Sequence, residues 1–121
     1  KEYEEIQIDN YFIFTKNERM PIYGFVGALD FENIYTGNPY FKVNVMTLSE
    51  GMKNHSYSIH SYDEFGIVAK GSLGIEFDNK ESYTLEEGEC ILIKSNTKHA
   101  VTNCSNEECI SYWIQITNCE K

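Results

Sequence analysis

Short apolar runs with a period of two, separated by turn-forming residues, constrain the fold of this chain more than any other feature. In 41–48, for example, Phe41, Val43 and Val45 alternate with polar residues. This alternation is typical of a half-buried strand. Only 1–8 has a pattern that could form a short amphipathic helix. The sequence therefore predicts an all-β sandwich or barrel.

The expected strands follow one another closely, and clusters of Gly, Asn, Asp and Ser mark the turns between them. We expect strands at 11–15, 22–26, 41–48, 65–69, 73–77, 82–85, 90–93, 100–102 and 110–116. No linker, repeat or low-complexity tract interrupts this series, so we expect one structural domain.

The composition of the chain limits the kinds of molecule that it is expected to bind. The 121 residues include 10 Lys+Arg and 19 Asp+Glu, which gives a formal net charge of −9. Such a chain repels phosphate backbones and anionic lipids, so we expect no nucleic-acid or membrane binding through the chain itself. The 41% hydrophobic and 14% aromatic content is typical of a packed core and not of disorder. Because the chain begins at Lys1 and not Met, the question whether a targeting segment was removed stays open.

The four cysteines bear on the redox compartment. We expect reduced thiols in an intracellular, cytoplasmic protein, with Cys90 buried inside the apolar run 90–93. Cys104 and Cys109 flank a polar turn, so the alternative is a disulfide between them or half of a metal site. In principle the four cysteines, Cys119 included, could pair in three ways.

Polar residues near the middle of the chain are spaced to share a face. Ser58, His60, Tyr62 and Glu64 have the same parity. Side chains two residues apart on an extended strand point to the same side, so we expect these four to point together. His99 stands at the start of a later expected strand.

The first of these stretches resembles the first motif of the cupin superfamily. That motif has a Gly, a His-x-His pair, a Glu three or four residues on, and a Gly after six more. His60 stands at the second His, and Glu64 and Gly71 follow at the motif's spacing. Ser58 replaces the first His, and a neutral hydroxyl is a weak metal ligand beside imidazole. His55 lies close by, but its spacing does not fit the missing position.

The later stretch is similar to the second cupin motif. Gly88, His99 and Asn103 match that motif at every spacing. Lys94 and Asn96 stand where the family has Pro and Gly, and Asn96 can still adopt a left-handed turn conformation. The resemblance extends from about residue 41 to about residue 116.

The resemblance implies a cupin-type double-stranded β-helix, a jelly-roll barrel with extra N-terminal strands. We expect the barrel at 41–121. We expect 1–40 to be an N-terminal extension or arm that packs on the barrel. Because an apolar edge strand invites pairing, these N-terminal strands could also exchange with a second subunit in a homodimer.

The resemblance also implies a metal site inside the barrel. Carried over from the family, His60, Glu64 and His99 would bind a divalent Fe, Mn, Zn or Ni ion. Two imidazoles and a carboxylate leave open positions for water or substrate. The alternative is that all three are structural, held by hydrogen bonds or a surface ion pair.

Further side chains are candidates for contact with a small-molecule ligand. Tyr62 shares parity with His60, so its phenol could be a catalytic proton donor. We expect Ser58, Tyr112 and Trp113 to contact the substrate, whereas the alternative is that the aromatic residues only fill the core.

Three functions fit these expectations. The first is a small cupin that binds a divalent metal and acts on or binds a small molecule. The second is the metal-free effector-binding domain of an AraC-type transcription regulator, since such domains resemble cupins with degraded metal motifs. The third is a non-catalytic carbohydrate-binding barrel. Whether the protein is an enzyme stays open.

Overall fold

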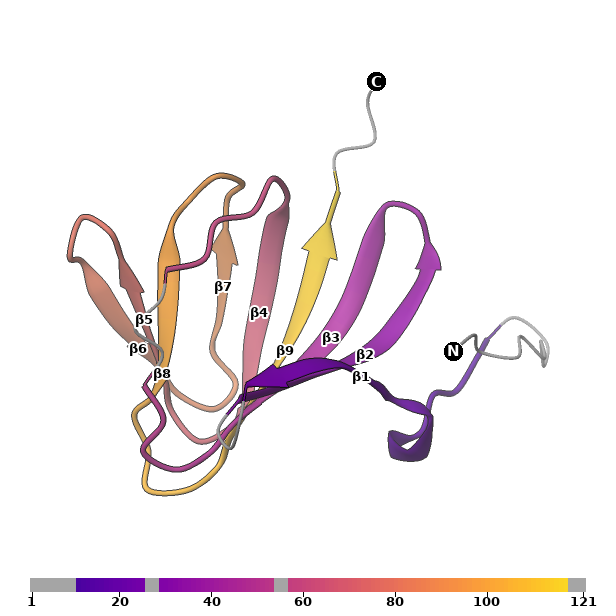
Figure 1. The fold of residues 1–121 in the computed structure, drawn as a ribbon, viewed down its shortest axis with the longest axis horizontal. Helices are drawn as coiled ribbons and strands as arrows, with labels where there is room; N and C mark the ends of the chain where they lie inside the picture. Colours follow the sequence, from indigo (N-terminus) through magenta and orange to yellow (C-terminus); the bar gives the residue numbers. More distant parts are fainter. Residues whose placement is uncertain (1–10, 26–28, 54–56, 118–121) are drawn as a thin grey trace.

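The computed structural model describes residues 11–25, 29–53 and 57–117, which form strands almost throughout (Figure 1). A single 3-10 turn, η1 (Lys16–Glu18), is the helical element of these ranges. The strands are β1 (Met20–Phe25), β2 (Leu29–Asn38), β3 (Phe41–Leu48), β4 (Asp63–Lys70), β5 (Leu73–Phe77), β6 (Ser82–Leu85), β7 (Cys90–Ile93), β8 (His99–Asn103) and β9 (Cys109–Ile116). The expectation of an all-β chain is confirmed.

Two antiparallel sheets make up the fold. One has six strands in the order β1-β2-β3-β9-β4-β7, and the other has three in the order β6-β5-β8. In Figure 1 the three-stranded sheet lies at the left, and β7, β4, β9, β3 and β2 follow to the right. β4 and β5 are consecutive along the chain but belong to different sheets. Crossing between two antiparallel sheets in this way is typical of a jelly roll, as predicted.

The core lies between the two sheets. The six-stranded sheet contributes Trp113, and the three-stranded sheet contributes Ile75. The buried cluster consists of Met46, Leu48, Val68, Leu73, Ile75, Ile93, Val101, Cys109 and Trp113. A Cβ at position 66 would lie 2.5 Å from the Trp113 ring. Only glycine therefore lets the indole pack flat against β4.

The glycine and asparagine positions of the two motifs are structural. Gly71 links β4 to β5 with a φ of +82°, a conformation that glycine adopts at little cost. Asn96 takes the left-handed conformation that the sequence predicted, with a φ of 64°. The side chain of Asn103 donates to the carbonyl oxygens of Leu48 at 3.1 Å and Glu107 at 2.7 Å. Asn103 thus ties the end of β8 to the end of β3 and to the turn before β9.

The N-terminal forty residues differ most from the sequence prediction. The described part of 11–15 contains an isolated bridge residue, Tyr11, but no strand. β2 was not predicted, because its register shifts between Asn33 and Tyr35 and the alternation of side chains breaks there. The short helix expected at 1–8 lies outside the described residues. The proposed division into an arm and a barrel stays a prediction.

Cysteine placement corrects one prediction. Cys90 is exposed, not buried, because β7 is an edge strand that points Ile91 and Ile93 inward and Cys90 outward. Cys104 and Cys109 are both free thiols. Burial, together with the nearby Cys104 and Glu107, raises the pKa of Cys109 to about 11. Cys119 and His55 lie outside the described residues.

Candidate metal centre

The three predicted metal ligands meet between the two sheets. Glu64 is on β4 of the six-stranded sheet, and His99 begins β8 of the three-stranded sheet. His60 stands in the segment that leads into β4. Glu64 and His99 are each only 6% exposed. The sequence predicted this convergence through the spacing of the two motifs.

The distances within this triad suit a small cation. Oε1 of Glu64 lies 3.3 Å from Nε2 of His99 and 3.6 Å from Nε2 of His60. The three ligand atoms all lie within 4.8 Å of one another. Metal bonds of about 2.1 Å place neighbouring ligand atoms roughly 3.0 to 3.6 Å apart, so a modest contraction would close the site on an ion.

The ring of His99 is oriented for coordination. Its Nδ1 lies 2.9 Å from the carbonyl oxygen of Thr97. Because a carbonyl oxygen only accepts, Nδ1 carries the proton and the neutral ring keeps a lone pair on Nε2. A second hydrogen bond of this kind is how metal-binding histidines are usually held.

Glu64 and His99 shift each other's pKa values. Burial alone would raise the pKa of Glu64, but the hydrogen bond with His99, the charge of His60 and the amide of Gln115 lower it overall. Burial alone would lower the pKa of His99, but its hydrogen bond to Glu64 and the one to Thr97 raise it overall. The charged form of each group therefore stabilises the charged form of the other, and a cation could take the place of the His99 proton.

Gln115 is a site residue that the sequence did not single out. Strand register pairs Glu64 of β4 with Gln115 of β9, and Gln115 with Lys42 of β3. Nε2 of Gln115 donates to Oε2 of Glu64 at 3.2 Å, which leaves Oε1 facing the two histidines. The alternation of 110–116 indicates which of its side chains share a face. It does not indicate the register that pairs Gln115 with Glu64.

Ser58 lies beside His99. The two residues exchange both backbone hydrogen bonds, at 2.7 and 3.0 Å, as an isolated antiparallel bridge. Directly paired residues point to the same side, with Cα atoms about 5.5 Å apart. The predicted position of Ser58 next to the metal ligands is therefore geometrically sound, although its role as a substrate contact stays a prediction.

Tyr62 contacts His60, one of the predicted metal ligands. Its hydroxyl lies 3.2 Å from Nδ1 of His60, and the two rings stack with centroids 4.9 Å apart. If Nδ1 donates to this hydroxyl, Nε2 of His60 is free to bind an ion. This geometry makes Tyr62 a residue that orients His60, and the predicted proton-donor role stays a prediction.

The two aromatic residues predicted to contact substrate lie on opposite faces of β9. Trp113 is 5% exposed and packs in the core, with its Nε1 donating to Oγ of Ser111 at 2.8 Å. Tyr112 points to the other face, where its hydroxyl lies 3.4 Å from the Arg19 guanidinium. Successive side chains of a strand alternate between faces, so the structure does not bring Tyr112 to the triad.

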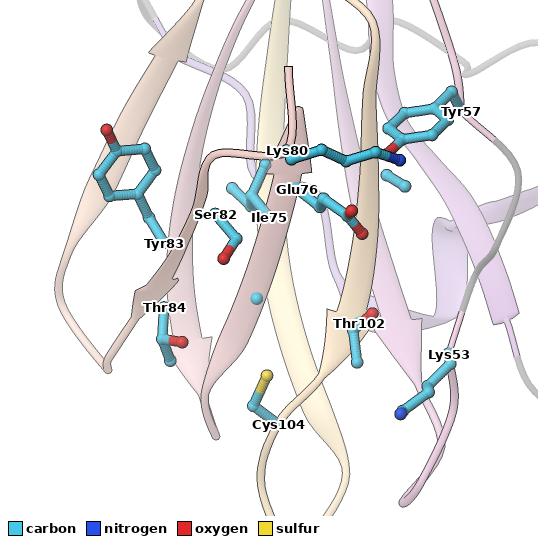
Figure 2. A pocket seen from close by; sticks show the side chains of 12 residues that line it. Lys53, Tyr57, Ile75, Glu76, Lys80, Ser82, Tyr83, Thr84, Thr102 and Cys104 are labelled. Carbon is cyan, nitrogen blue, oxygen red and sulfur yellow. The ribbon is translucent and has the colours of Figure 1, made fainter. Parts of the chain in front are cut away.

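A concavity lies on the outer face of the three-stranded sheet (Figure 2). Its volume is about 520 Å³. The lining residues are Lys53, Tyr57, Gly74, Ile75, Glu76, Lys80, Ser82, Tyr83, Thr84, Ala100, Thr102 and Cys104. We call it the outer groove. Thr102 and His99 differ in parity on β8, so the groove and the triad lie on opposite faces of that strand.

Comparison with known protein families tests the resemblance to cupins that the two motifs showed. The cupin domain family matches residues 44–115, more than half of the chain. The chain belongs to the cupin superfamily. A search of curated proteins gave no significant match.

Solved cupin structures share the fold of this cupin at low sequence identity. Hydroxypropylphosphonic acid epoxidase from S. wedmorenis aligns with a TM-score of 0.76 and 16% identity, over 90% of this chain and 61% of that one. KdgF from Halomonas sp. aligns with a TM-score of 0.72 and 14% identity, over 91% and 97%. The cupin domain of an XRE family transcriptional regulator from Enterobacter cloacae aligns with a TM-score of 0.67 and 19% identity, over 75% and 98%.

These similarities show the fold and do not transfer an activity. This cupin spans less than two thirds of the epoxidase, as its 61% coverage shows. Among the described residues, no helix has the length and apolar character that crossing a bilayer requires.

Proposed function

We propose that this cupin binds one divalent transition metal through His60, Glu64 and His99 and uses it to bind or transform a small molecule inside the barrel. The observation that carries the proposal is the convergence of two Nε2 atoms on one buried carboxylate oxygen. A mixed imidazole and carboxylate donor set suits Fe, Mn, Zn or Ni. With three protein ligands, open coordination positions remain for water or ligand.

The surrounding residues would hold the ligands in place. Thr97 fixes the ring of His99, Tyr62 contacts His60, and Gln115 occupies the second oxygen of Glu64. A metal held in this way polarises a bound oxygen or activates a bound water. A solved structure of similar fold is named as the FeII form of HppE, which is one example of a metal on this fold. The second half of the proposal is that the bound metal binds or transforms a small molecule.

Metal analysis tests the first half. Protein prepared without chelator should contain close to one equivalent of metal, and the metal-free protein should gain thermal stability on addition of Fe²⁺, Mn²⁺, Ni²⁺ or Zn²⁺. Glu64→Gln keeps the size of the side chain but removes the anionic ligand, so it should lose both effects. Glu76→Gln, an exposed change in the outer groove, is the matched control and should lose neither. Absence of bound metal together with no thermal shift in the wild-type protein contradicts the proposal.

A metal-free sensor is the second candidate function. Two observations favour it: Ser58 replaces a histidine ligand, and a transcription-regulator cupin domain shares the fold. As an effector-binding domain of the AraC type, this cupin would be joined to a basic DNA-binding domain in a longer protein. The length of the native reading frame and a screen of small molecules by thermal shift, with and without metal, separate the two candidates.

The third candidate, a carbohydrate-binding barrel, has support only from the outer groove with its exposed tyrosines. A homodimer, a small-molecule ligand and a cytoplasmic location also stay predictions of this proposal. Sedimentation equilibrium tests the dimer, and it does so independently of the metal site.

A further inference from the structure

The outer face of the six-stranded sheet, opposite the face that carries Glu64, is apolar across four adjacent strands. Strand register aligns four apolar residues in one row, namely Leu92 of β7, Phe65 of β4, Ile114 of β9 and Val43 of β3. Phe65 adjoins Glu64 on β4, so this row points away from the metal ligands. Water reaches much of it, because Leu92 is 51% exposed and Ile114 is 36% exposed. Ile67 and Ile116, on the same face, are 39% and 43% exposed.

One end of this outer face is covered by the chain itself. The Arg19 guanidinium lies 3.4 Å from the Tyr112 hydroxyl and 3.6 Å from the Glu32 carboxylate. Val45 is paired in register with both Tyr112 and Glu32, and it is only 1% exposed. Arg19 thus covers the face over β2 and β3. The part over β9, β4 and β7 stays in contact with water, and we call it the open face.

Charge favours a second copy of this chain as the occupant of the open face. The net charge of −9 makes two copies repel each other over most of their surfaces. Among the outward positions of 63–67, 90–93 and 112–116, Asp63 alone is charged, and Lys94 pairs with it at 3.4 Å. Two acidic copies therefore meet here with the least repulsion. Anionic lipids and nucleic acids lack any positive charge on this face to bind.

The size of the open face sets the strength of such a contact. With strands about 4.8 Å apart and a rise of about 3.4 Å per residue, four strands of five residues span about 19 by 17 Å. Contiguous apolar patches of about 300–600 Å² are the largest on typical monomers and are often functional. A standard interface buries about 800 Å² per partner, so we expect a modest interface with a dissociation constant in the micromolar range.

We propose that this cupin forms a two-fold symmetric homodimer in which the open faces of two copies pack on each other. Two-fold symmetry brings the same patch of both subunits into contact. Two sheets pack face to face at about 10 Å, so the corrugated rows of Leu92 and Ile114 can interdigitate with those of the partner copy. This surface differs from the exchange of N-terminal strands that the sequence predicted. The inference is independent of the metal site, which lies on the inner face of the sheet.

Sedimentation equilibrium of the whole chain over a range of concentrations tests this surface. Leu92→Lys and Ile114→Lys should each weaken dimerisation about tenfold or more, because each would bury an unpaired charge in the contact. Both changes make the chain less acidic, so general repulsion does not account for a weaker dimer. Tyr83→Lys is the matched control: it makes the same charge change at a 55% exposed position of β6 and should leave the dimer unchanged. Circular dichroism checks the fold of each variant.

Cysteine reactivity reports on the open face without any substitution. Cys90 is exposed and pairs with Ile67 on this face, whereas Cys104 is exposed beside the three-stranded sheet. Raising the protein concentration through the dissociation constant should slow alkylation of Cys90 but not of Cys104, as mass spectrometry resolves. A wild-type protein that stays monomeric at every concentration overturns the inference. A dimer that persists in both Leu92→Lys and Ile114→Lys, or one in which Cys90 stays as reactive as in the monomer, also overturns it.

Discussion

The site formed by His60, Glu64 and His99, which we call the metal chamber, and the outer groove lie on opposite faces of β8. The two regions hold their charged side chains in different ways. In the chamber, Glu64 and His99 have side chains that are only 8% exposed, and they contact each other at 3.3 Å. In the groove, Glu76 and Lys80 are exposed to water. Charges in water need no protein partner, whereas buried charges cost several kcal/mol unless they are paired.

This difference shows which region is built to select a ligand. The chamber holds its charged groups by specific contacts from Thr97, Gln115 and Tyr62, so their positions are set before a cation arrives. The groove has an ordinary solvated surface with tyrosines at its margin. Preorganised donor atoms bind metal with little loss of side-chain freedom. We therefore expect large responses from substitutions in the chamber and small ones from the groove.

The largest response should come from His99→Ala. It removes one of three strong ligands, so metal affinity should fall by at least about a hundredfold, more than is typical for loss of a supporting contact. Isothermal titration with Zn²⁺ measures the affinity, and circular dichroism checks the fold. Thr102→Ala changes the opposite face of the same strand and should bind Zn²⁺ like the wild type. Retained affinity in the His99 variant would count against the assignment of the site.

The metal ligands were predictable from sequence because motif spacing reports strand geometry. The resemblance to the two cupin motifs implied His60, Glu64 and His99 as ligands, and the shared parity of His60 and Glu64 agreed with it. Lys42 and Gln115 were not predictable as residues of one row with Glu64. Their proximity depends on the register of β3, β9 and β4, and pairing between strands distant in sequence is not encoded in any local pattern.

The next largest response should be to pH. The raised pKa of His99 means that the metal-free site keeps its proton above the ordinary value of 6.5, so metal must displace that proton. Below the folded pKa, affinity should fall about tenfold per pH unit for each proton displaced. Zn²⁺ titrations between pH 5.5 and 8 measure the slope. An affinity independent of pH over this range would contradict the pairing of Glu64 with His99.

The stability of the metal-free protein should pass through a maximum as pH changes. The raised pKa of His99 contributes stability that is fully present below about pH 6.5 and is lost as pH rises through its folded value. The lowered pKa of Glu64 contributes stability that is present above about pH 4.5 and is lost as pH falls through its folded value. The pair therefore stabilises the metal-free chamber most between these values. Glu64→Gln should flatten this profile, which urea unfolding at several pH values measures.

A smaller, favourable response should come from Ser58→His. The backbone bridge to His99 directs the side chain at position 58 to the same side as that ligand. A fourth imidazole there should strengthen Zn²⁺ binding, by about tenfold at most because the bridge also fixes the distance. Ser58→Ala is the control and should change the affinity little. No gain from the histidine would show that position 58 does not face the ion.

The fold itself was largely predictable, and its exceptions have physical causes. Strands with regular alternation, such as β3 and β5, were predicted at their observed bounds. β2 was missed because an irregularity near Tyr35 breaks its alternation, and Tyr112 was misplaced relative to the triad because an aromatic residue suits either face of β9. Periodicity gives the type of element, but the face that meets the core depends on the partner sheet.

The smallest response should come from the groove, and it provides the sharpest test of the contrast. Thr84 is exposed and lies on β6, where it pairs with Gly74 on the outer face of the three-stranded sheet. Thr84→Ala should leave Zn²⁺ affinity within about twofold of the wild type, since exposed changes seldom perturb distant sites. A sugar that stabilises the wild-type protein but not this variant would assign binding to the groove. If Thr84→Ala instead weakened Zn²⁺ binding tenfold, the two faces of the three-stranded sheet would be coupled, and the groove could no longer be treated as a passive surface.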